Sequence, residues 1–172
     1  AVVINYIQKF FYAQFSSSPY LVSALSPLAF LFAALLVRKF APKAKGSGIP
    51  QVLEALEQSA NHDTSNSAWN SPLISLRTAA IKILSSSAGI LGGASIGREG
   101  QTVQIASSIF TAVGRKIRKH VPSIELPSYI TAGAAAGVAA AFNTQLAGIT
   151  FVLEEIVDGA LASLRQPMMM AV

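Results

Sequence analysis

The chain has 172 residues, of which 52% are hydrophobic and only 12% are charged, about half the charged share of an ordinary soluble domain. Its mean hydropathy is +0.49, and this balance favours a membrane protein over a soluble domain. No cysteine is present, which excludes a disulfide framework and a thiolate metal site.

The net charge of +5 does not indicate nucleic-acid binding. The basic residues gather in two short clusters, each after a long apolar run, as in cytoplasmic loops of membrane proteins. Basic strands with interleaved aromatic residues, which would stack on bases, are missing. The clusters are Arg38, Lys39, Lys43 and Lys45, and then Arg115, Lys116, Arg118 and Lys119.

The expected fold is a single all-α transmembrane domain covering residues 1–172. The uncharged runs 11–37 and 127–153 are each long enough to cross about 30 Å of hydrocarbon. Shorter apolar stretches broken by Gly, Pro and Ser are typical of tilted, broken or re-entrant helices. The predicted helices are 1–15, 21–40 (kinked at Pro27 or starting there), 51–58, 72–90, 100–118, 127–142 and 146–158, with residues 59–71 as a polar loop.

The segment Gly92–Gly100 carries the strongest functional signal. Arg98 and Glu99 are adjacent there, between two uncharged stretches, and an ionisable pair in such a setting indicates function. Glycines let backbone amides approach a ligand, and the helix predicted from Gly100 would present its positive end to an anion. Glu99 could occupy this site itself and leave it when protonated, which is the behaviour of a gate.

Two further motifs admit two interpretations each. The run Gly46–Pro50 precedes a predicted helix and exposes amides and the Ser47 hydroxyl, but a flexible turn after a basic loop explains it equally well. Glu154 and Glu155 follow an apolar helix, and adjacent helical residues point about 100° apart. One of them is expected to be solvated, and the other to relay protons with Glu99.

Other features favour structural roles. Glycines four residues apart, as in Gly133 and Gly137, predict close helix packing. His62 and His120 stand in polar segments, too isolated to suggest a metal site. No set of nucleophile, base and acid is visible, so an enzyme is not expected.

Three segments together closely resemble the CLC family of chloride channels and chloride/proton exchangers, in its bacterial branch. They are residues 37–50, from Val-Arg-Lys-Phe-Ala-Pro to Gly-Ser-Gly-Ile-Pro, then Gly-Arg-Glu-Gly at 97–100, and finally 135–155, from Ala-Ala-Gly to the Glu pair. Their order and spacing match the family over nearly the whole chain.

The resemblance implies a role for particular residues. Ser47 would coordinate the central chloride, and serine there, rather than proline, implies a preference for chloride over nitrate. Glu99 would be the gating glutamate, with the backbone amides near residues 98–101 lining an outer anion site. Glu155 would transfer protons at the inner end of its helix. The implied anion-binding residues are Gly46, Ser47, Gly48, Ile49 and Pro50 in the first segment, and Arg98, Glu99, Gly100 and Gln101 in the second.

The chain departs from the family pattern in two ways. Gln101 stands where the family usually has proline, and it retains an N–H that proline lacks. The resemblance also covers only the first of the family's two inverted repeats, without the second repeat's Gly-x-Phe-x-Pro loop and anion-facing tyrosine. A complete pore therefore requires the second half of the same subunit.

The implied activity is chloride transport across a bacterial inner membrane, as a chloride/proton antiporter, by a homodimer of complete subunits with no cofactor. The alternatives are a passive voltage-gated-type chloride channel, against which Glu155 argues, and a non-transporting membrane scaffold that binds partners through its small-residue faces.

Overall fold

The computed structural model describes residues 19–61, 69–97, 99–120 and 124–151, together with Tyr6, Lys9, Ala13 and Glu154. Within these ranges the chain is helical and contains no strand. The elements are α2 (Pro19–Phe40), η1 (Pro42–Ala44), α3 (Ile49–Asn61), η2 (Pro72–Ile74), α5 (Leu76–Leu91), α6 (Glu99–Ile117), α7 (Leu126–Phe142) and α8 (Gln145–Phe151).

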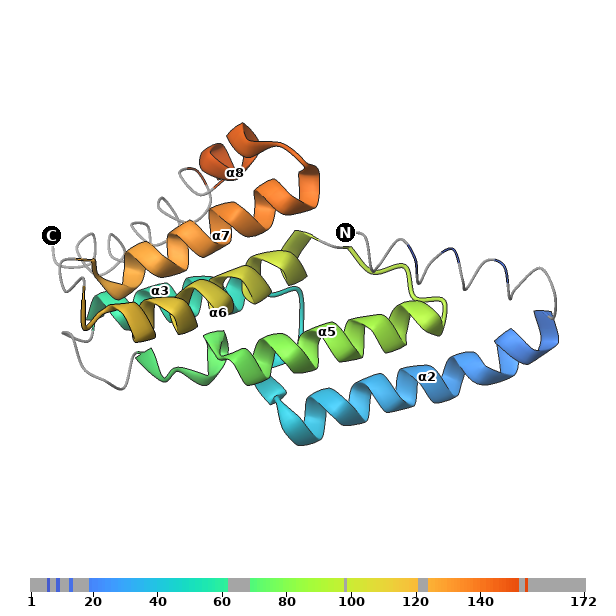
Figure 1. Cartoon of the computed structure of the whole chain (residues 1–172). Helices are drawn as coiled ribbons and strands as arrows, with labels where there is room; N and C mark the ends of the chain where they lie inside the picture. Colours follow the sequence, from blue (N-terminus) through green and yellow to red (C-terminus); the bar gives the residue numbers. More distant parts are fainter. Residues whose placement is uncertain are drawn as a thin grey trace, which may run out of the picture.

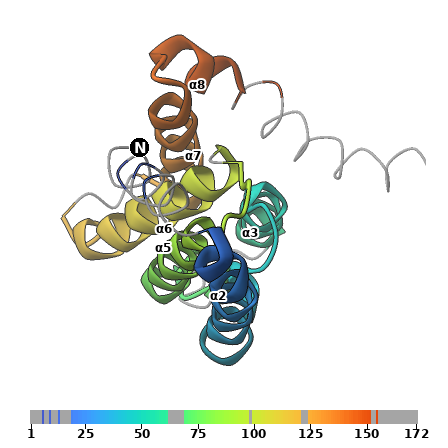
Figure 2. The same ribbon diagram turned by 90° about the vertical axis from the view of Figure 1, so that its right-hand side faces the viewer.

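Helix α6 is the centre of the arrangement (Figures 1 and 2). It packs against α7 on one side and α5 on the other, and α3 also contacts it. Helix α2 lies along α5, while α8 folds back onto α7. The buried apolar core lies among α3, η2, α6 and α7, with Val52, Leu73, Val103, Ile130 and Val138 at its centre.

The contact between α6 and α7 depends on small residues, as predicted. A Cβ atom added at Gly133 would lie 2.6 Å from the Cα of Ser107, and one at Gly137 would lie 2.6 Å from the carbonyl oxygen of Thr102. These neighbours are backbone atoms, which cannot move aside. The two helices therefore touch through their main chains.

Several predicted boundaries are confirmed. Helix α6 begins within one residue of the predicted start, and α7 and α8 are separated at Asn143 and Thr144. Asn143 has a left-handed φ of 57°, a conformation in which helices commonly end. Helix α2 continues through Pro27, so the alternative that it begins there is wrong. A proline inside a helix removes one hydrogen bond without ending every helix.

Two predicted helices have wrong limits. Residues 72–74 form a 3₁₀ turn, and α5 begins only after Ser75, whose hydroxyl caps it by accepting a hydrogen bond from the Thr78 amide at 3.2 Å. Helix α3 is longer than the predicted 51–58 at both ends. It starts earlier because proline is accepted in a first turn, and polar residues extend its far end to Asn61.

None of the helices among the described residues combines the length and the apolar character needed to cross a membrane. Most of the predicted run 11–37 lies in α2, and the predicted run 127–153 is divided between α7 and α8, so neither forms a membrane-crossing helix within the described residues. The predicted helix 1–15 falls largely outside the described residues, as do most of the predicted polar loop and the end of the last helix.

Candidate functional site

Ser47 lies in a short loop between two glycines that adopt left-handed backbone conformations. The φ angles are +86° at Gly46 and +117° at Gly48, a region that side chains disfavour and glycine accepts. Helix α3 begins directly afterwards, at Ile49, with Pro50 in its first turn. Ser47 itself is exposed. The loop therefore presents a hydroxyl at the start of a helix.

This loop packs directly on the first turn of α6. A Cβ atom added at Gly48 would overlap the carbonyl oxygen of Gly100, and one added at Gly100 would lie 2.7 Å from the carbonyl oxygen of Ser47. Both positions must be glycine for the two backbones to approach this closely. The fold thus brings together the two segments that the sequence analysis predicted to bind an anion.

Glu99 is the first residue of α6, and its side chain is exposed. Amides in the first turn of a helix lack intrahelical partners, and the helix dipole favours negative charge there. The Glu99 carboxylate reaches back toward Gly97: its Oε2 atom is 2.9 Å from the place that a Cβ at Gly97 would take. The carboxylate and a mobile anion would therefore be attracted to the same helix end.

Some predicted residues lie outside the described part of the chain. Arg98 and Glu155 are among them, as is His62. Glu154 and His120 are described, and both are exposed. The described residues contain no group of three His, Cys, Asp or Glu side chains placed to hold a metal ion.

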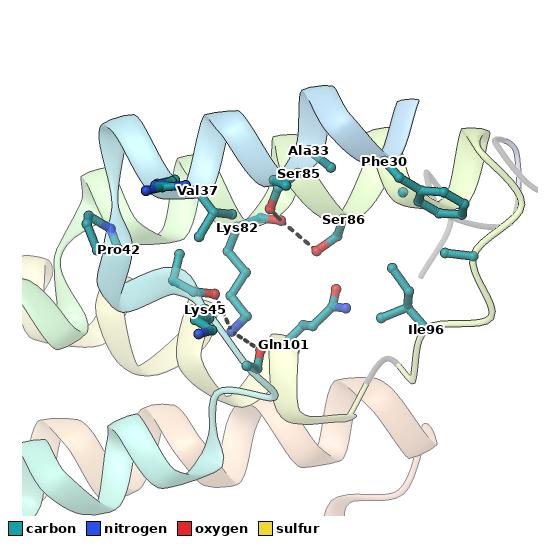
Figure 3. Close-up of a pocket in the computed structure, with 16 residues that line it drawn as sticks. Phe30, Ala33, Val37, Pro42, Lys45, Lys82, Ser85, Ser86, Ile96 and Gln101 are labelled. Atoms are coloured by element: carbon teal, nitrogen blue, oxygen red, sulfur yellow. Dashed lines mark hydrogen bonds between the residues drawn. The ribbon is translucent and has the colours of Figure 1, made fainter. Parts of the chain in front are cut away.

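Gln101, where the resemblance implies proline, lies in the first turn of α6 and faces a cavity that Lys45 and Gly46 also line. Its side chain is only 9% exposed, and its carboxamide projects into this cavity of about 650 Å³ between α2, α5 and the start of α6 (Figure 3). Other lining residues include Phe30, Val37, Ser85, Ser86 and Ile96. The Gln101 side chain therefore belongs to the wall between α2 and α5.

The sequence analysis missed two buried polar residues beside the site, Lys82 in α5 and Gln104 in α6. They are 2% and 0% exposed. The Lys82 ammonium donates to the Gln104 Oε1 atom at 2.7 Å. It also donates to two carbonyl oxygens of the segment before Ser47, those of Ala44 and Gly46 (Figure 3). The one available signal was a lone lysine at the start of an uncharged helical stretch, because lysine is almost never fully buried without a partner.

The described part of the chain is thus an all-helical unit in which two glycine-flanked helix starts meet. The family described as voltage gated chloride channel matches residues 29–172. Because this match covers most of the chain, the chain belongs to the voltage-gated chloride channel family, which confirms the resemblance seen in the sequence.

The similar proteins include bacterial exchangers. The chain is 39% identical over 137 residues to the H(+)/Cl(-) exchange transporter ClcA of Citrobacter koseri, a match that covers 76% of this chain and 26% of that protein. It is 38% identical over 139 residues to the ClcA proteins of Salmonella arizonae and Salmonella paratyphi B, covering 77% of this chain and 27% of each relative. The chain thus spans about a quarter of the length of these curated relatives.

Proposed function

We propose that this chain forms the first inverted repeat of a chloride transporter subunit, and that chloride binds where the Ser47 loop meets the start of α6. The observation that carries this proposal is the backbone contact between Gly48 and Gly100. It joins an exposed hydroxyl to the positive end of a 19-residue helix, and hydroxyls and free amides at helix starts are the groups that bind small anions in proteins.

Coupling to protons is the finer part of the proposal. The relatives are named H(+)/Cl(-) exchange transporters, and the chain carries a glutamate at each of the two positions that the family resemblance assigns to proton transfer, Glu99 and Glu155. Glu99 would open the anion site when protonated, and Glu155 would pass protons to the inner solution. The family description also covers channels, so a passive chloride channel is the second candidate.

A non-transporting scaffold is disfavoured by the packing. The small residues Gly133 and Gly137 of α7 are already covered by the α6 backbone within this chain. They are therefore not available to bind a partner, as the scaffold hypothesis requires.

The functional unit would be larger than this chain. We expect the second half of the same subunit to complete the pore, two complete subunits to form a homodimer, and the assembly to lie in the lipid bilayer of a bacterial inner membrane. Chloride and protons are the proposed substrates, and no cofactor is proposed.

Glu99→Gln tests the proposal in the protein encoded by the whole gene, reconstituted into liposomes. Glutamine mimics the protonated carboxyl, so chloride flux should persist without pH dependence, and proton movement should cease. Glu54→Gln is a matched control, because Glu54 is an exposed glutamate on α3; it should leave both fluxes unchanged. Proton pumping driven by a chloride gradient in Glu99→Gln would contradict the gating role of Glu99.

Glu155→Gln separates the relay from the gate. It should also stop proton movement, but chloride flux should keep its pH dependence because Glu99 is intact. Loss of that pH dependence in Glu155→Gln would show that the two roles are misassigned.

A further inference from the structure

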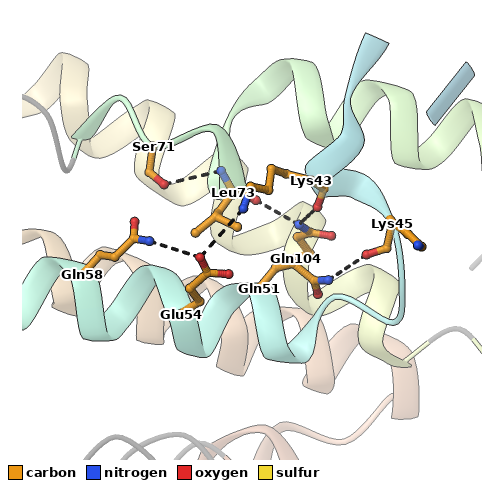
Figure 4. A network of polar contacts seen from close by, with 8 residues as sticks. All are labelled: Lys43, Lys45, Gln51, Glu54, Gln58, Ser71, Leu73 and Gln104. Carbon is orange, nitrogen blue, oxygen red and sulfur yellow. Dashed lines mark hydrogen bonds and ion pairs between the residues drawn. The ribbon is translucent and has the colours of Figure 1, made fainter. Parts of the chain in front are cut away.

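The backbone that leads into Ser47 has an unusual property: every carbonyl oxygen from residue 43 to residue 46 accepts a hydrogen bond from a side chain. Gln104 donates to the oxygen of Lys43 at 3.2 Å, and Gln51 donates to that of Lys45 at 2.7 Å (Figure 4). Lys82 donates to the oxygens of Ala44 at 3.1 Å and Gly46 at 2.9 Å. Four consecutive peptide oxygens are therefore held by three side chains.

The two central side chains, Lys82 and Gln104, use all of their N–H donors. The three N–H groups of Lys82 have three acceptors, the third being the Gln104 Oε1 atom. The Gln104 amide nitrogen donates to the oxygens of Lys43 and Leu73. A buried polar pair whose donors are all satisfied is rigid and favours one arrangement. The third side chain, Gln51, donates to the loop, but its Oε1 atom is buried without a hydrogen-bond partner among the described residues.

The chemistry of anion binding explains what such an arrangement would do. A carbonyl oxygen carries partial negative charge and repels an anion, whereas an amide N–H or a hydroxyl attracts it. A peptide whose oxygen is held on one side presents its N–H to the other side. The amides of Ala44 and Lys45 donate to the oxygens of Ala41 and Pro42, so this argument concerns the amides of Gly46 and Ser47. Gly46, with its left-handed φ, allows successive peptides to turn in this way, as in the anion-binding turns called nests.

We propose that Lys82 is a positioning residue for the chloride site: it holds the carbonyl oxygens of Ala44 and Gly46 toward α5, so that the Gly46 and Ser47 amides and the Ser47 hydroxyl face the anion. Gln104 and Gln51 assist by holding the neighbouring oxygens of Lys43 and Lys45. This inference rests on the proposed function. It assigns Lys82 a role through the loop, because its three donors are already engaged and none is left for a bound anion.

The burial of Lys82 supports a functional reason for the residue. Among the described residues it is the one buried side chain that carries a charge, and its three acceptors are neutral oxygens rather than carboxylates. Burying an ammonium is costly unless it is well hydrogen-bonded. An apolar residue could fill the same space, but it could not hold the loop.

The test measures chloride binding by calorimetry in the whole-gene protein, comparing wild type, Lys82→Met, Ser47→Ala and the double variant. Lys82→Met keeps the side-chain length and removes its donors. It should weaken chloride binding by about tenfold, the effect of losing an outer-shell partner of a bound ion, and reduce the preference for chloride over nitrate. Lys116→Met is the matched control, because Lys116 is exposed in the last turn of α6; it should leave binding unchanged.

The double variant distinguishes positioning from a long-range effect of charge. If Lys82 acts through the Ser47 loop, Lys82→Met should weaken binding much less in the Ser47→Ala background than in wild type. Equal weakening in both backgrounds would overturn the inference, as would unchanged binding in Lys82→Met. Wild-type protein that binds no chloride would instead overturn the proposed function.

Gln51→Leu gives a second test that does not depend on the folding of Lys82→Met. Gln51 is half-buried and holds one carbonyl oxygen, that of Lys45. Its loss should weaken chloride binding by about threefold, the effect of one neutral hydrogen bond, again only when Ser47 is present. Full-strength binding in Gln51→Leu, with Lys82→Met unfolded, would also count against the proposal.

Discussion

Two regions of this chain bring backbones into contact through glycines, and they differ in what the contact leaves accessible. Between α6 and α7, Gly133 and Gly137 lie against the main chain of α6. At the start of α6, Gly100 lies against the main chain of the Ser47 loop. The first contact joins two helices along their length, and the second joins a helix end to a loop.

The consequence is a difference in polarity. In the middle of a helix the peptide groups are hydrogen-bonded within the helix, so close packing of α6 and α7 buries apolar atoms such as those of Ile130 and Val138. At a helix start the first amides lack such partners, and Ser47 and Glu99 are exposed beside them. A backbone contact through glycine therefore stabilises the fold between α6 and α7, and it forms a candidate site at the start of α6.

The largest expected effect comes from breaking the contact between the two helices. Gly137→Ala would place a methyl group 2.6 Å from the Thr102 carbonyl oxygen, and the helices would have to separate. Overpacking of this kind costs about 1–3 kcal/mol, and a contact with backbone should be near the upper end. Thermal stability is measured on the purified protein, as the fraction that still elutes as folded protein in size-exclusion chromatography after heating.

Gly114→Ala is the companion variant for this prediction. A Cβ atom at Gly114 would meet ring atoms of Tyr129, a side chain that can rotate away. Its loss of stability should therefore be smaller than that of Gly137→Ala. Equal losses would show that backbone contact is not what makes the α6–α7 packing sensitive.

Breaking the contact at the site should affect binding more than stability. Gly100→Ala would push a methyl group to 2.7 Å from the Ser47 carbonyl oxygen and displace the loop. We expect chloride binding to weaken about tenfold, which corresponds to about 1.4 kcal/mol, measured by calorimetry. Gly137→Ala should leave the chloride affinity of the folded protein unchanged, and a similar loss of affinity in both variants would remove the distinction between the two regions.

The smallest expected effect concerns selectivity. Ser47→Pro removes the hydroxyl and the backbone N–H while leaving both glycines in place. Chloride and nitrate both lose these two donors, so the preference for chloride changes only by the difference between their losses. It should fall about threefold, the size of one hydrogen bond, with thermal stability little changed. Competition between the two anions in a flux assay measures this preference. An unaltered preference would show that Ser47 does not belong to the anion site.

The parts of the fold that follow from local sequence were predictable. The break between α7 and α8 coincides with Asn143, a residue type that tolerates the left-handed conformation at a helix end, and the start of α6 coincides with Glu99 after a glycine-rich stretch. The sequence offers two helix starts before α5, a proline at 72, which suits a first turn, and a serine at 75, which suits an N-cap. The structure uses Ser75, and the predicted start at 72 is wrong.

The assembly of the site was less accessible from the sequence. Family resemblance implied a central chloride at Ser47 and an outer anion site beside Glu99, but no local pattern indicates that Gly48 touches Gly100. The contacts of Lys82 with the loop span 36 and 38 residues of sequence, and hydrogen bonds of this range depend on how α5, α6 and the loop pack. A buried lysine among apolar residues shows that it needs partners, but not which ones.

The most direct test of the central claim is the location of a bound halide. Crystals of the whole-gene protein grown in bromide should show an anomalous scattering peak within hydrogen-bonding distance of the Ser47 hydroxyl, beside the first turn of α6, and the peak should weaken in Gly100→Ala. Bromide peaks that occur only elsewhere in the protein, with none at this junction, would contradict the account.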